Sequence, residues 1–398
     1  MTGKVIIKPL DDLCCLITKQ TGFDYSTTIK PSLATKQLDG FLPFIQNKDF
    51  EGEHINLKTD YYVPEKIALR FPKILLDSTI LLISISGKIG NVGLYNIPQL
   101  SFVGGAICVC RLKKEENGKY LMYYLQSSKG QNHLLHSVKA ASHSNITVED
   151  IRKVPIPIPS LSEQTRIVEI LDTFTASIEN LKQQIADRRK QYEHYRDQLL
   201  DLEGKEGVEM KTIGMIAKYR RGSFPQPYGN KEWYDGEGAM PFVQVADVEE
   251  SGMKLKSSTK QFISRLAMPK SVYAPIGTIL VTLQGSIGKV AITQYNSYVD
   301  RTLGIFEGFT IDINKKYFAH QLEKIFAIKK EKARGGTIKT ITKEEFTNFP
   351  IPIPSHDEQQ RIVSILDTFE ASIQNLEAQL KEREKQYEYY RNKLLTFD

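Results

Sequence analysis

The stretch PIPIPSLSEQTRIVEILDTF, residues 155–174, occurs a second time as PIPIPSHDEQQRIVSILDTF, residues 350–369. When residues 155–200 are aligned with residues 350–395, 31 of the 46 positions are identical. Identity of this extent far exceeds chance, so the chain contains an internal duplication. We call these two stretches the repeated segments.

The repeated segments predict two long helices with sharply marked starts. Ser160 and Ser355 each stand three residues before a glutamate, as in a capping box, where the serine accepts from the third helical N–H and the glutamate bonds back to the cap. The preceding prolines hold the backbone extended, because each excludes the helical conformation at the residue before it. A helix of about 40 residues is about 60 Å long.

Apolar residues in the repeated segments alternate three and four positions apart over nearly five heptads, which predicts a coiled coil. The predicted seam is Ile167, Leu171, Phe174, Ile178, Leu181, Ile185, Arg188, Tyr192, Tyr195 and Leu199 in the first copy and Ile362, Leu366, Phe369, Ile373, Leu376, Leu380, Arg383, Tyr387, Tyr390 and Leu394 in the second. We expect the two copies to pair with each other, although each helix could instead pack on its own globular domain.

The regions between the repeats are a second, diverged duplication. LPFIQ at 42–46 matches MPFVQ at 240–244, and TILLISISGKIGNVGLY at 79–95 matches TILVTLQGSIGKVAIT at 278–293, with a strand, a glycine turn and a return strand expected in each. The prediction is an α+β fold, with two β-rich mixed globular domains separated by two long coiled-coil helices. The predicted segments are domain 1 (1–154), repeat 1 (155–207), domain 2 (208–349) and repeat 2 (350–398).

Composition and charge narrow the function of the 398-residue chain. The net charge is +6, and the four segments carry +5, −3, +7 and −3 in order, so the two globular domains are basic. Clustered positive charge is typical of proteins that bind polyanions, although a solvated surface can vary this much by chance. The N-terminus is a poor signal peptide, and the four cysteines lie in the first half only, so we expect a reducing cytoplasm.

Motifs that would indicate catalysis are missing from the sequence. It has no phosphate-binding loop, zinc-protease motif, paired C-x-x-C, nucleophile elbow or amino-methyltransferase tetrapeptide, and its seven histidines form no pair at metal-binding spacing on a helix. We therefore expect no catalytic residue, metal or cofactor. A self-sufficient nuclease is a further hypothesis that would require cleavage by the isolated chain with a divalent metal.

The arrangement resembles the specificity subunit of type I restriction-modification enzymes. The resemblance rests on PIPIPSLSEQTRIV with its second copy, and on GGTIKTITKEEFTNF at 335–349, and it spans essentially the whole chain. It implies that each globular domain reads one half of a split double-stranded DNA target. It also implies that the two long helices pair antiparallel and dock two methyltransferase subunits, to which restriction subunits can add. Domain 1 departs from the pattern, with AASHSNITVED where domain 2 has RGGTIKTITKEE.

Candidate DNA-binding residues lie on the glycine turns and in basic or glycine-rich loops. Glycine turns let the backbone approach a groove, lysine and arginine reach phosphates, and a glutamine amide can read adenine. The candidates are Gln46, Ser86, Lys88, Ser142, His143, Arg220, Arg221, Gln244, Gln284, Ser286, Lys289, Arg334, Thr337 and Lys339. Exposed hairpins, structural hydrogen bonds and ordinary surface charge are the alternatives at these positions.

Four residues near the helix starts are candidates for partner contacts, because they are identical in both copies and cap geometry does not explain them: Gln164, Arg166, Gln359 and Arg361. A competing hypothesis for the whole chain is a coiled-coil scaffold whose globular domains bind protein or carbohydrate. That hypothesis explains the heptads but not the basic charge, and a steep salt dependence of duplex binding would separate the two.

Overall fold

A computed structural model describes residues 5–52, 54–136, 145–250, 252–332 and 343–397. Contacts divide the chain into two compact units: unit 1 holds residues 1–182 and 379–398, and unit 2 holds residues 183–378. Each unit therefore contains one globular domain and half of each long helix. Within the described residues, no helix is both long and apolar enough to cross a bilayer.

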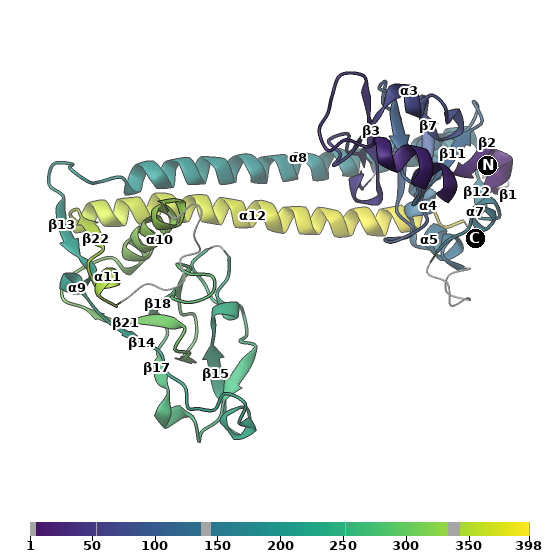
Figure 1. Ribbon diagram of the computed structural model, residues 1–398. Coiled ribbons are helices and arrows are strands. Elements are labelled where there is room, and N and C mark those ends of the chain that lie inside the picture. The colour runs from purple at the N-terminus through teal and green to yellow at the C-terminus, as the bar shows by residue number, and fades with distance from the viewer. Residues whose placement is uncertain (1–4, 53, 137–144, 251, 333–342, 398) are drawn as a thin grey trace. The chain divides into compact units, whose positions relative to one another are not determined.

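Domain 1 is built from three sheets, and Figure 1 labels some of their strands. The orders are β1-β12, β2-β11-β8-β9 and β6-β3-β10-β7, and a small β4-β5 hairpin is added. The strands are β1 (Ile6–Pro9), β2 (Cys14–Lys19), β3 (Phe41–Ile45), β4 (Phe50–Glu51), β5 (His54–Ile55), β6 (Tyr62–Pro64), β7 (Leu75–Leu76), β8 (Ile80–Ser84), β9 (Val92–Tyr95), β10 (Ser101–Val103), β11 (Ile107–Leu112) and β12 (Pro155–Ile158). The helices are α1 (Leu10–Leu13), α2 (Gly22–Asp24), α3 (Glu65–Ala68), α4 (Gly118–Gln126), α5 (Ser128–Leu134) and α7 (Val148–Arg152).

Domain 2 repeats the three sheets of domain 1 strand for strand, without a named counterpart of the β4-β5 hairpin among its described residues. Its sheet orders are β13-β22, β14-β21-β18-β19 and β16-β15-β20-β17. The strands are β13 (Glu209–Thr212), β14 (Ala217–Arg221), β15 (Met240–Val243), β16 (Gln261–Ile263), β17 (Val272–Ala274), β18 (Ile279–Thr282), β19 (Val290–Ile292), β20 (Ser297–Val299), β21 (Leu303–Phe309) and β22 (Pro350–Ile353). The helices are α9 (Ile213–Ile216), α10 (Lys315–Lys332) and α11 (Lys343–Thr347). The predicted α+β duplication is confirmed, while the exact segment boundaries stay predictions.

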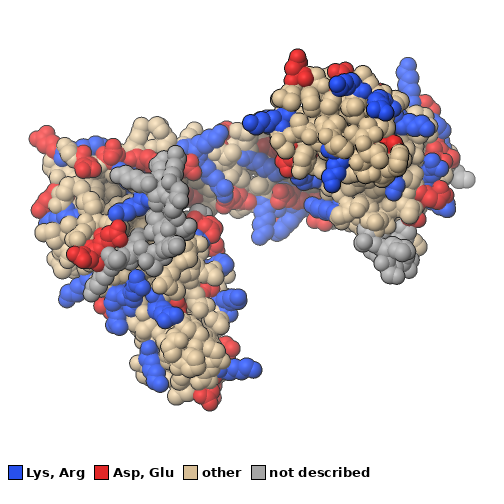
Figure 2. All heavy atoms as spheres, in the orientation of Figure 1, with Lys and Arg blue, Asp and Glu red and all other residues tan. Residues whose placement is uncertain are grey.

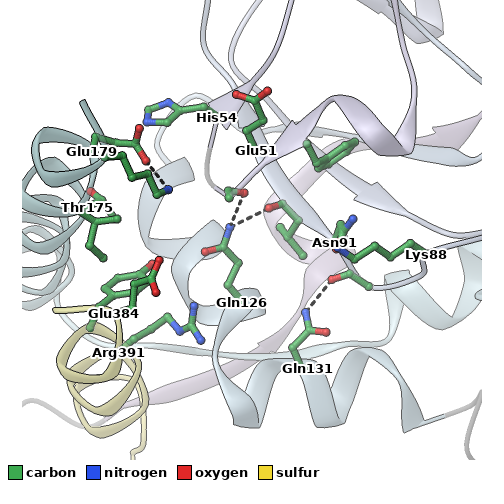
Figure 3. Close-up of a pocket in the computed structure, with 17 residues that line it drawn as sticks. Glu51, His54, Lys88, Asn91, Gln126, Gln131, Thr175, Glu179, Glu384 and Arg391 are labelled. Carbon is green, nitrogen blue, oxygen red and sulfur yellow. Dashed lines mark hydrogen bonds and ion pairs between the residues drawn. The ribbon is translucent and has the colours of Figure 1, made fainter. Parts of the chain in front are cut away.

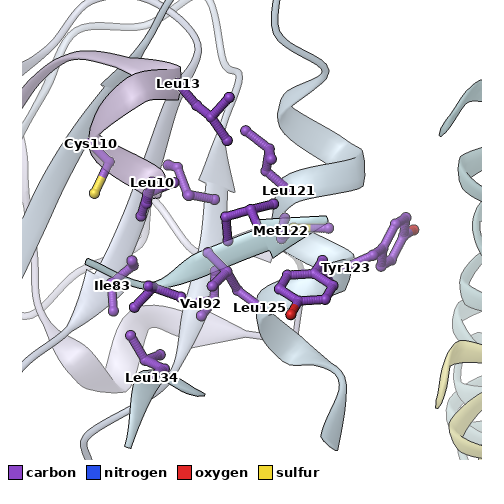
Figure 4. Close-up of a cluster of buried hydrophobic side chains, with 14 of the residues drawn as sticks. Leu10, Leu13, Ile83, Val92, Cys110, Leu121, Met122, Tyr123, Leu125 and Leu134 are labelled. Carbon is purple, nitrogen blue, oxygen red and sulfur yellow. The ribbon is translucent and has the colours of Figure 1, made fainter. Parts of the chain in front are cut away.

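The central sheet of domain 1 is buried on both faces. Along β8, Leu81 and Ile83 face the cluster that contains α4, whereas Ile80 and Leu82 face a second cluster around β3 and β10. Successive side chains of a strand point to opposite faces, so a strand between two cores is apolar throughout. Figure 4 shows the first of these clusters, with Leu121, Met122 and Leu125 of α4 packed near strand residues.

The apolar stretch over residues 119–135 lies in two helices, α4 and α5. It breaks at Ser127, whose hydroxyl caps α5 by accepting from the backbone N–H of Gly130 at 3.1 Å. A Cβ on Gly130 would lie 2.0 Å from the carbonyl oxygen of Tyr124, so only glycine fits beside the end of α4. Domain 2 has no such break, and α10 runs for 18 residues.

The long helices are α8 (Leu161–Leu200) and α12 (His356–Leu394), of 40 and 39 residues. Both Ser160 and Ser355 cap them as predicted, accepting from the third helical N–H at 3.3 Å. The other half of the predicted capping box is wrong for both glutamates. Their carboxylates bind an arginine one turn further along the helix instead of bonding back to the cap.

Two aromatic clusters hold the helices together, one in each unit. In unit 1, Phe174 of α8 stacks on Tyr390 of α12 with ring centroids 5.3 Å apart, and the guanidinium of Arg383 lies 5.7 Å from the same ring. Unit 2 repeats this geometry: Tyr195 of α8 stacks on Phe369 of α12 with ring centroids 5.4 Å apart, and the guanidinium of Arg188 lies 5.8 Å from the Phe369 ring. The heptad pairing of the two copies is thus confirmed, and each seam arginine lies on an aromatic face of the other helix.

Equivalent contacts attach each domain to the repeated segment that follows it. The hydroxyl of Tyr120 donates to the carbonyl of Pro157 at 2.6 Å, and Tyr317 donates to Pro352 at 2.8 Å. Burial raises the pKa of both tyrosines. The ammonium of Lys119 pairs with Asp172, and Lys316 pairs with Asp367 in the equivalent place. The scaffold of the two halves is therefore equivalent down to single hydrogen bonds.

Candidate nucleic-acid interface

In domain 1, four loops meet at one end of the two large sheets. The parallel pairing of β3 with β10 places the residue after Ile45 beside Gly104, whose N–H donates to the Ile45 carbonyl at 2.9 Å. The backbone N–H of Ile85, after β8, donates to Ala106 at 2.8 Å. Lys19 pairs with Cys108 near the start of β11. Residues far apart in sequence are therefore neighbours at this end.

The glycine turns at this end are built identically in both domains. Ser84 closes the first turn by donating to the carbonyl of Lys88 at 2.7 Å and accepting from the N–H of Asn91 at 2.8 Å. Thr282 makes the equivalent bonds to Ser286 and Lys289. Matching these bonds aligns Ser86 with Gln284, so the same backbone carries different side chains in the two domains.

Left-handed backbone explains the glycines in these turns: φ is +74° at Gly87, +84° at Gly90, +69° at Gly285 and +82° at Gly288. Only glycine adopts such angles without strain. A Cβ on Gly288 would also lie 2.5 Å from Phe326. The predicted strand, turn and return strand are confirmed by the β8–β9 and β18–β19 pairs.

Gln46 and Ser86 both line a cavity of about 650 Å³ in domain 1. We call it the domain 1 cavity, and its walls also include Gln20, Tyr25 and residues 104–107. The backbone N–H of Gln46 donates to the carboxylate of Asp49 at 2.7 Å, and that of Gln244 donates to Asp247 at 2.8 Å. The structure thus brings together two residues that the sequence analysis singled out separately, and it adds Gln20, which no motif marks.

Domain 2 has larger residues where domain 1 has the cavity floor. The N–H of Gly104 donates to the carbonyl of Ile45, and the N–H of Asp300 donates to Val243 in the same way; Ala106 and Thr302 likewise accept equivalent bonds from Ile85 and Leu283. Residues 104–106 of domain 1 therefore correspond to residues 300–302 of domain 2, which are Asp300, Arg301 and Thr302. Asp300 is 2% exposed; it accepts from the hydroxyls of Tyr228 and Thr302. The guanidinium of Arg301 lies 5.2 Å from the ring of Tyr228. The two domains therefore differ at the end where their loops meet.

The basic candidates of domain 2 occupy different environments. Arg220 pairs with Glu307 at 3.3 Å and is half exposed, whereas Lys289 pairs with Glu250 and is largely covered. Arg221 is exposed at the end of β14 and interacts with the hydroxyl of Tyr219, whose pKa burial raises. Figure 2 shows lysines and arginines spread over the visible surface of both domains, with acidic side chains between them.

Lys88 is exposed on its turn and lines another cavity in unit 1, of about 700 Å³ (Figure 3). This cavity lies between the turn and the long helices, and three acidic side chains balance three basic ones: Glu51, Glu179, Glu384, Lys88, Lys182 and Arg391. Gln126 and Gln131 donate to the carbonyls of Val92 and Gly90, both at 2.8 Å. These amides hold the turn in place, so we assign this cavity a structural role.

Five candidates lie outside the described residues: Ser142, His143, Arg334, Thr337 and Lys339. Gln284 is half-buried and Ser286 is exposed on the second glycine turn. Across the described ranges, His, Cys, Asp and Glu side chains form no group of three that would hold a metal ion.

The four helix candidates divide into two kinds. Gln164 and Gln359 are buried, and they donate to the carbonyls of Pro159 and Pro354 at 3.1 and 3.0 Å, which locks the proline segment onto the helix. Gln359 also accepts from the N–H of Asn314 at 2.9 Å. The amides of Gln164 and Gln359 thus make hydrogen bonds within the chain. Of the four candidates, the two arginines remain for contact with a partner.

Arg166 and Arg361 are each held by two bonds to a glutamate one turn earlier. Arg166 binds Glu163 at 2.6 and 2.8 Å, and Arg361 binds Glu358 at 2.7 Å through both nitrogens. This hydrogen bonding lowers the pKa of both glutamates. The arginine side chains remain 52% and 55% exposed. Each repeat therefore presents one positioned, exposed guanidinium at the start of its helix.

Comparison with known proteins places this fold in a family. The chain matches the type I restriction modification DNA specificity domain twice, over residues 9–187 and 205–384. It is 35% identical to a type I restriction enzyme specificity subunit of Escherichia coli, over 62% of this chain and 63% of that protein. It is 30% identical to a putative specificity subunit of Haemophilus influenzae, over 72% of this chain and 74% of that protein. A solved structure, from work on assembly of a type I R-M system, has a TM-score of 0.67 at 18% identity, covering 100% of this chain and 98% of its own.

Proposed function

The chain belongs to the family of type I restriction modification DNA specificity domains, and from this premise we propose that it is the DNA-recognition subunit of such a system. Each globular domain reads one half of a bipartite target, and the chain itself catalyses no reaction. The alternative of a scaffold for protein or carbohydrate ligands gains no support from the family match.

The observation that carries the proposal is a duplicated scaffold with unlike recognition ends. Tyr120 and Tyr317 bond in the same way to the proline strands β12 and β22, yet the same place on the two glycine turns holds Ser86 in one domain and Gln284 in the other. A protein that reads two different half-sites with one fold requires this pattern. The charges of +5 and +7 on the two domains suit contacts to phosphates.

The partners in this proposal are double-stranded DNA and two methyltransferase subunits, to which restriction subunits can add. Two equivalent surfaces for one kind of partner suit the repeated segments, because each presents the same helix start with Arg166 or Arg361 exposed. The proposed location is the cytoplasm, where DNA is accessible and thiols stay reduced.

Exchange of one domain tests the proposal. A chain whose residues 208–349 come from a relative is expected to change one half of the preferred target and to keep the other half, because each domain has its own core and its own contacts to the helices. The measurement is sequencing of duplexes that the chain selects from a randomised pool, with the unaltered chain as control. Selection of both halves anew, or binding without sequence preference, would contradict the proposal.

A further inference from the structure

The domain 1 cavity results from three small residues at adjacent positions. Gly104, Gly105 and Ala106 line it, and the bulkier Asp300 and Arg301 take the places of the two glycines in domain 2. The cavity opens where the ends of β2, β3 and β8 meet, beside the first glycine turn. The small residues of its floor are therefore specific to domain 1, and they lie at an end of the fold where the two domains differ.

Gln20 has a polar group in this wall that the fold does not use. It is 4% exposed, and neither its amide nitrogen nor its amide oxygen has a hydrogen-bond partner among the described residues. Its oxygen would lie 3.5 Å from a Cβ on Gly105, so the amide borders the cavity floor. Domain 2 has Gly222 after the equivalent strand, where a Cβ would lie 2.3 Å from the carbonyl oxygen of Asp300.

A buried amide without partners destabilises a fold, whereas an apolar side chain of the same shape would not. Such a group therefore calls for an explanation beyond packing. A glutamine side chain has three torsions, and its amide can turn into the cavity while the backbone stays in place. Gln46 and Ser86 lie in the same cavity, so a ligand there meets several polar side chains.

We propose that Gln20 reads an adenine in the half-site of domain 1, with the base edge entering the domain 1 cavity. The inference rests on the proposed function. An amide offers one donor and one acceptor side by side, which match N7 and the N6 amino group of adenine in the major groove. Pairing with the base would satisfy both atoms of an amide that no described residue pairs.

The test compares Gln20→Met with the unaltered full chain in selection from a randomised duplex pool. Methionine is unbranched and of similar length but lacks the amide. We expect the preference for adenine at one position of one half-site to fall by roughly 5- to 100-fold, the range of one bidentate contact. The other half-site should be unchanged. Gln37→Met, at an exposed glutamine outside the cavity, is the matched control and should change no position.

A second variant, Gly105→Ser, tests the cavity itself. The position tolerates a Cβ, and the added hydroxyl would pair with the Gln20 amide and fill part of the cavity, so the same position should lose its preference. Thermal unfolding separates reading from folding: Gln20→Met should melt no lower than the unaltered chain. A lower melting temperature of Gln20→Met with uniformly weaker binding would show that the amide has a structural role, and would overturn the inference. An unchanged target sequence for Gln20→Met, or a preference lost at a G·C pair, would also overturn it. If the unaltered chain selects no motif, the proposed function fails along with the inference.

Discussion

His320 lies at the position in α10 that Tyr123 holds in α4, as the matching bonds of Tyr120 and Tyr317 show. Tyr123 donates to Asp172 at 2.7 Å, but neither ring nitrogen of the fully buried His320 has a hydrogen-bond partner in the described structure. Burial, with Lys316 and Arg196 nearby, lowers the pKa of His320 to about 3. The imidazole is therefore held neutral in unit 2.

The neutral His320 predicts a loss of stability in mild acid. The unfolded chain takes up a proton near pH 6.5 and the folded chain only near pH 3, so stability is full above pH 6.5 and falls as the pH drops from 6.5 toward 3. Between pH 7.5 and pH 5 this site should cost unit 2 about 2 kcal/mol of unfolding free energy. This loss is measured by denaturant unfolding at the two pH values, followed by the fluorescence of Trp233. Trp233 is the chain's single tryptophan and belongs to unit 2.

The variant that isolates this effect is His320→Leu, which fills the site with a group that does not titrate. It should abolish the decline over this pH range, whereas His194→Gln, at an exposed histidine of α8 in the same unit, should leave it in place. An equal decline in both variants would show that other groups cause it.

Gln20 and His320 also show where prediction from the sequence ends. Both belong to no motif, and their importance comes from tertiary pairing that places them in a cavity wall or a core where no described residue bonds to them. The sequence marks Gln46 because Gln244 stands at the matching place in the other half, and it marks Ser86 because this residue lies on a glycine turn. Their proximity depends on the parallel β3–β10 contact, which nothing in the local sequence specifies.

Among the elements, the long helices were predicted with most detail because proline, serine and heptad signals agree along 40 residues. The capping box failed at Glu163 and Glu358 because each has a better partner: a guanidinium three residues later binds both carboxylate oxygens. A charge-assisted bidentate pair is stronger than a single bond to a neutral backbone N–H.

The helix starts predict a partner contact that can be measured. Arg166→Ala combined with Arg361→Ala should weaken association with the methyltransferase subunit by about tenfold, since positioned arginines are common anchors of interfaces. Unfolding should change little, because exposed ion pairs contribute at most about 1 kcal/mol. Binding is measured by titration of the purified methyltransferase against the full chain.

Lys182→Ala is the matched control for the arginine variant. Lys182 pairs with Glu179 at 2.9 Å, also three residues apart on α8, and it is 51% exposed, but the second repeat has Glu377 in its place. Loss of methyltransferase binding in this control to the same degree would mean that any charge change on the helix is disruptive, and would remove the specific role of the arginines.

At the scale of the whole molecule, α8 and α12 are shared by both units, and the proposed function makes their length a ruler between half-sites. Seven residues inserted after Leu181, with seven more after Leu376, keep the heptad phase and add about 10 Å to each helix. The preferred spacer should lengthen by about three base pairs at 3.4 Å each, without change in either half-site.

Selection from duplex pools with variable spacers measures this effect, and circular dichroism verifies the added helix. Three base pairs also rotate one half-site about the DNA axis by nearly a third of a turn, so weaker overall binding is compatible with the prediction. A single insertion after Leu181 should impair folding, because it leaves the two seams unequal. Full affinity for the original spacer, with both helices longer, would exclude the ruler.

The two units become complete in the opposite order to that in which their globular domains are synthesised. Unit 2 is one continuous stretch, residues 183–378, whereas unit 1 requires residues 379–398. Leu395 lies in the same core cluster as Leu171, Asn392 accepts from the N–H of Ser128 at 2.8 Å, and Lys129 donates to the carbonyl of Phe397 at 3.1 Å. On the ribosome, domain 1 emerges first, but unit 1 is completed last. All residues of unit 2 have been synthesised before the last residues of unit 1 are added.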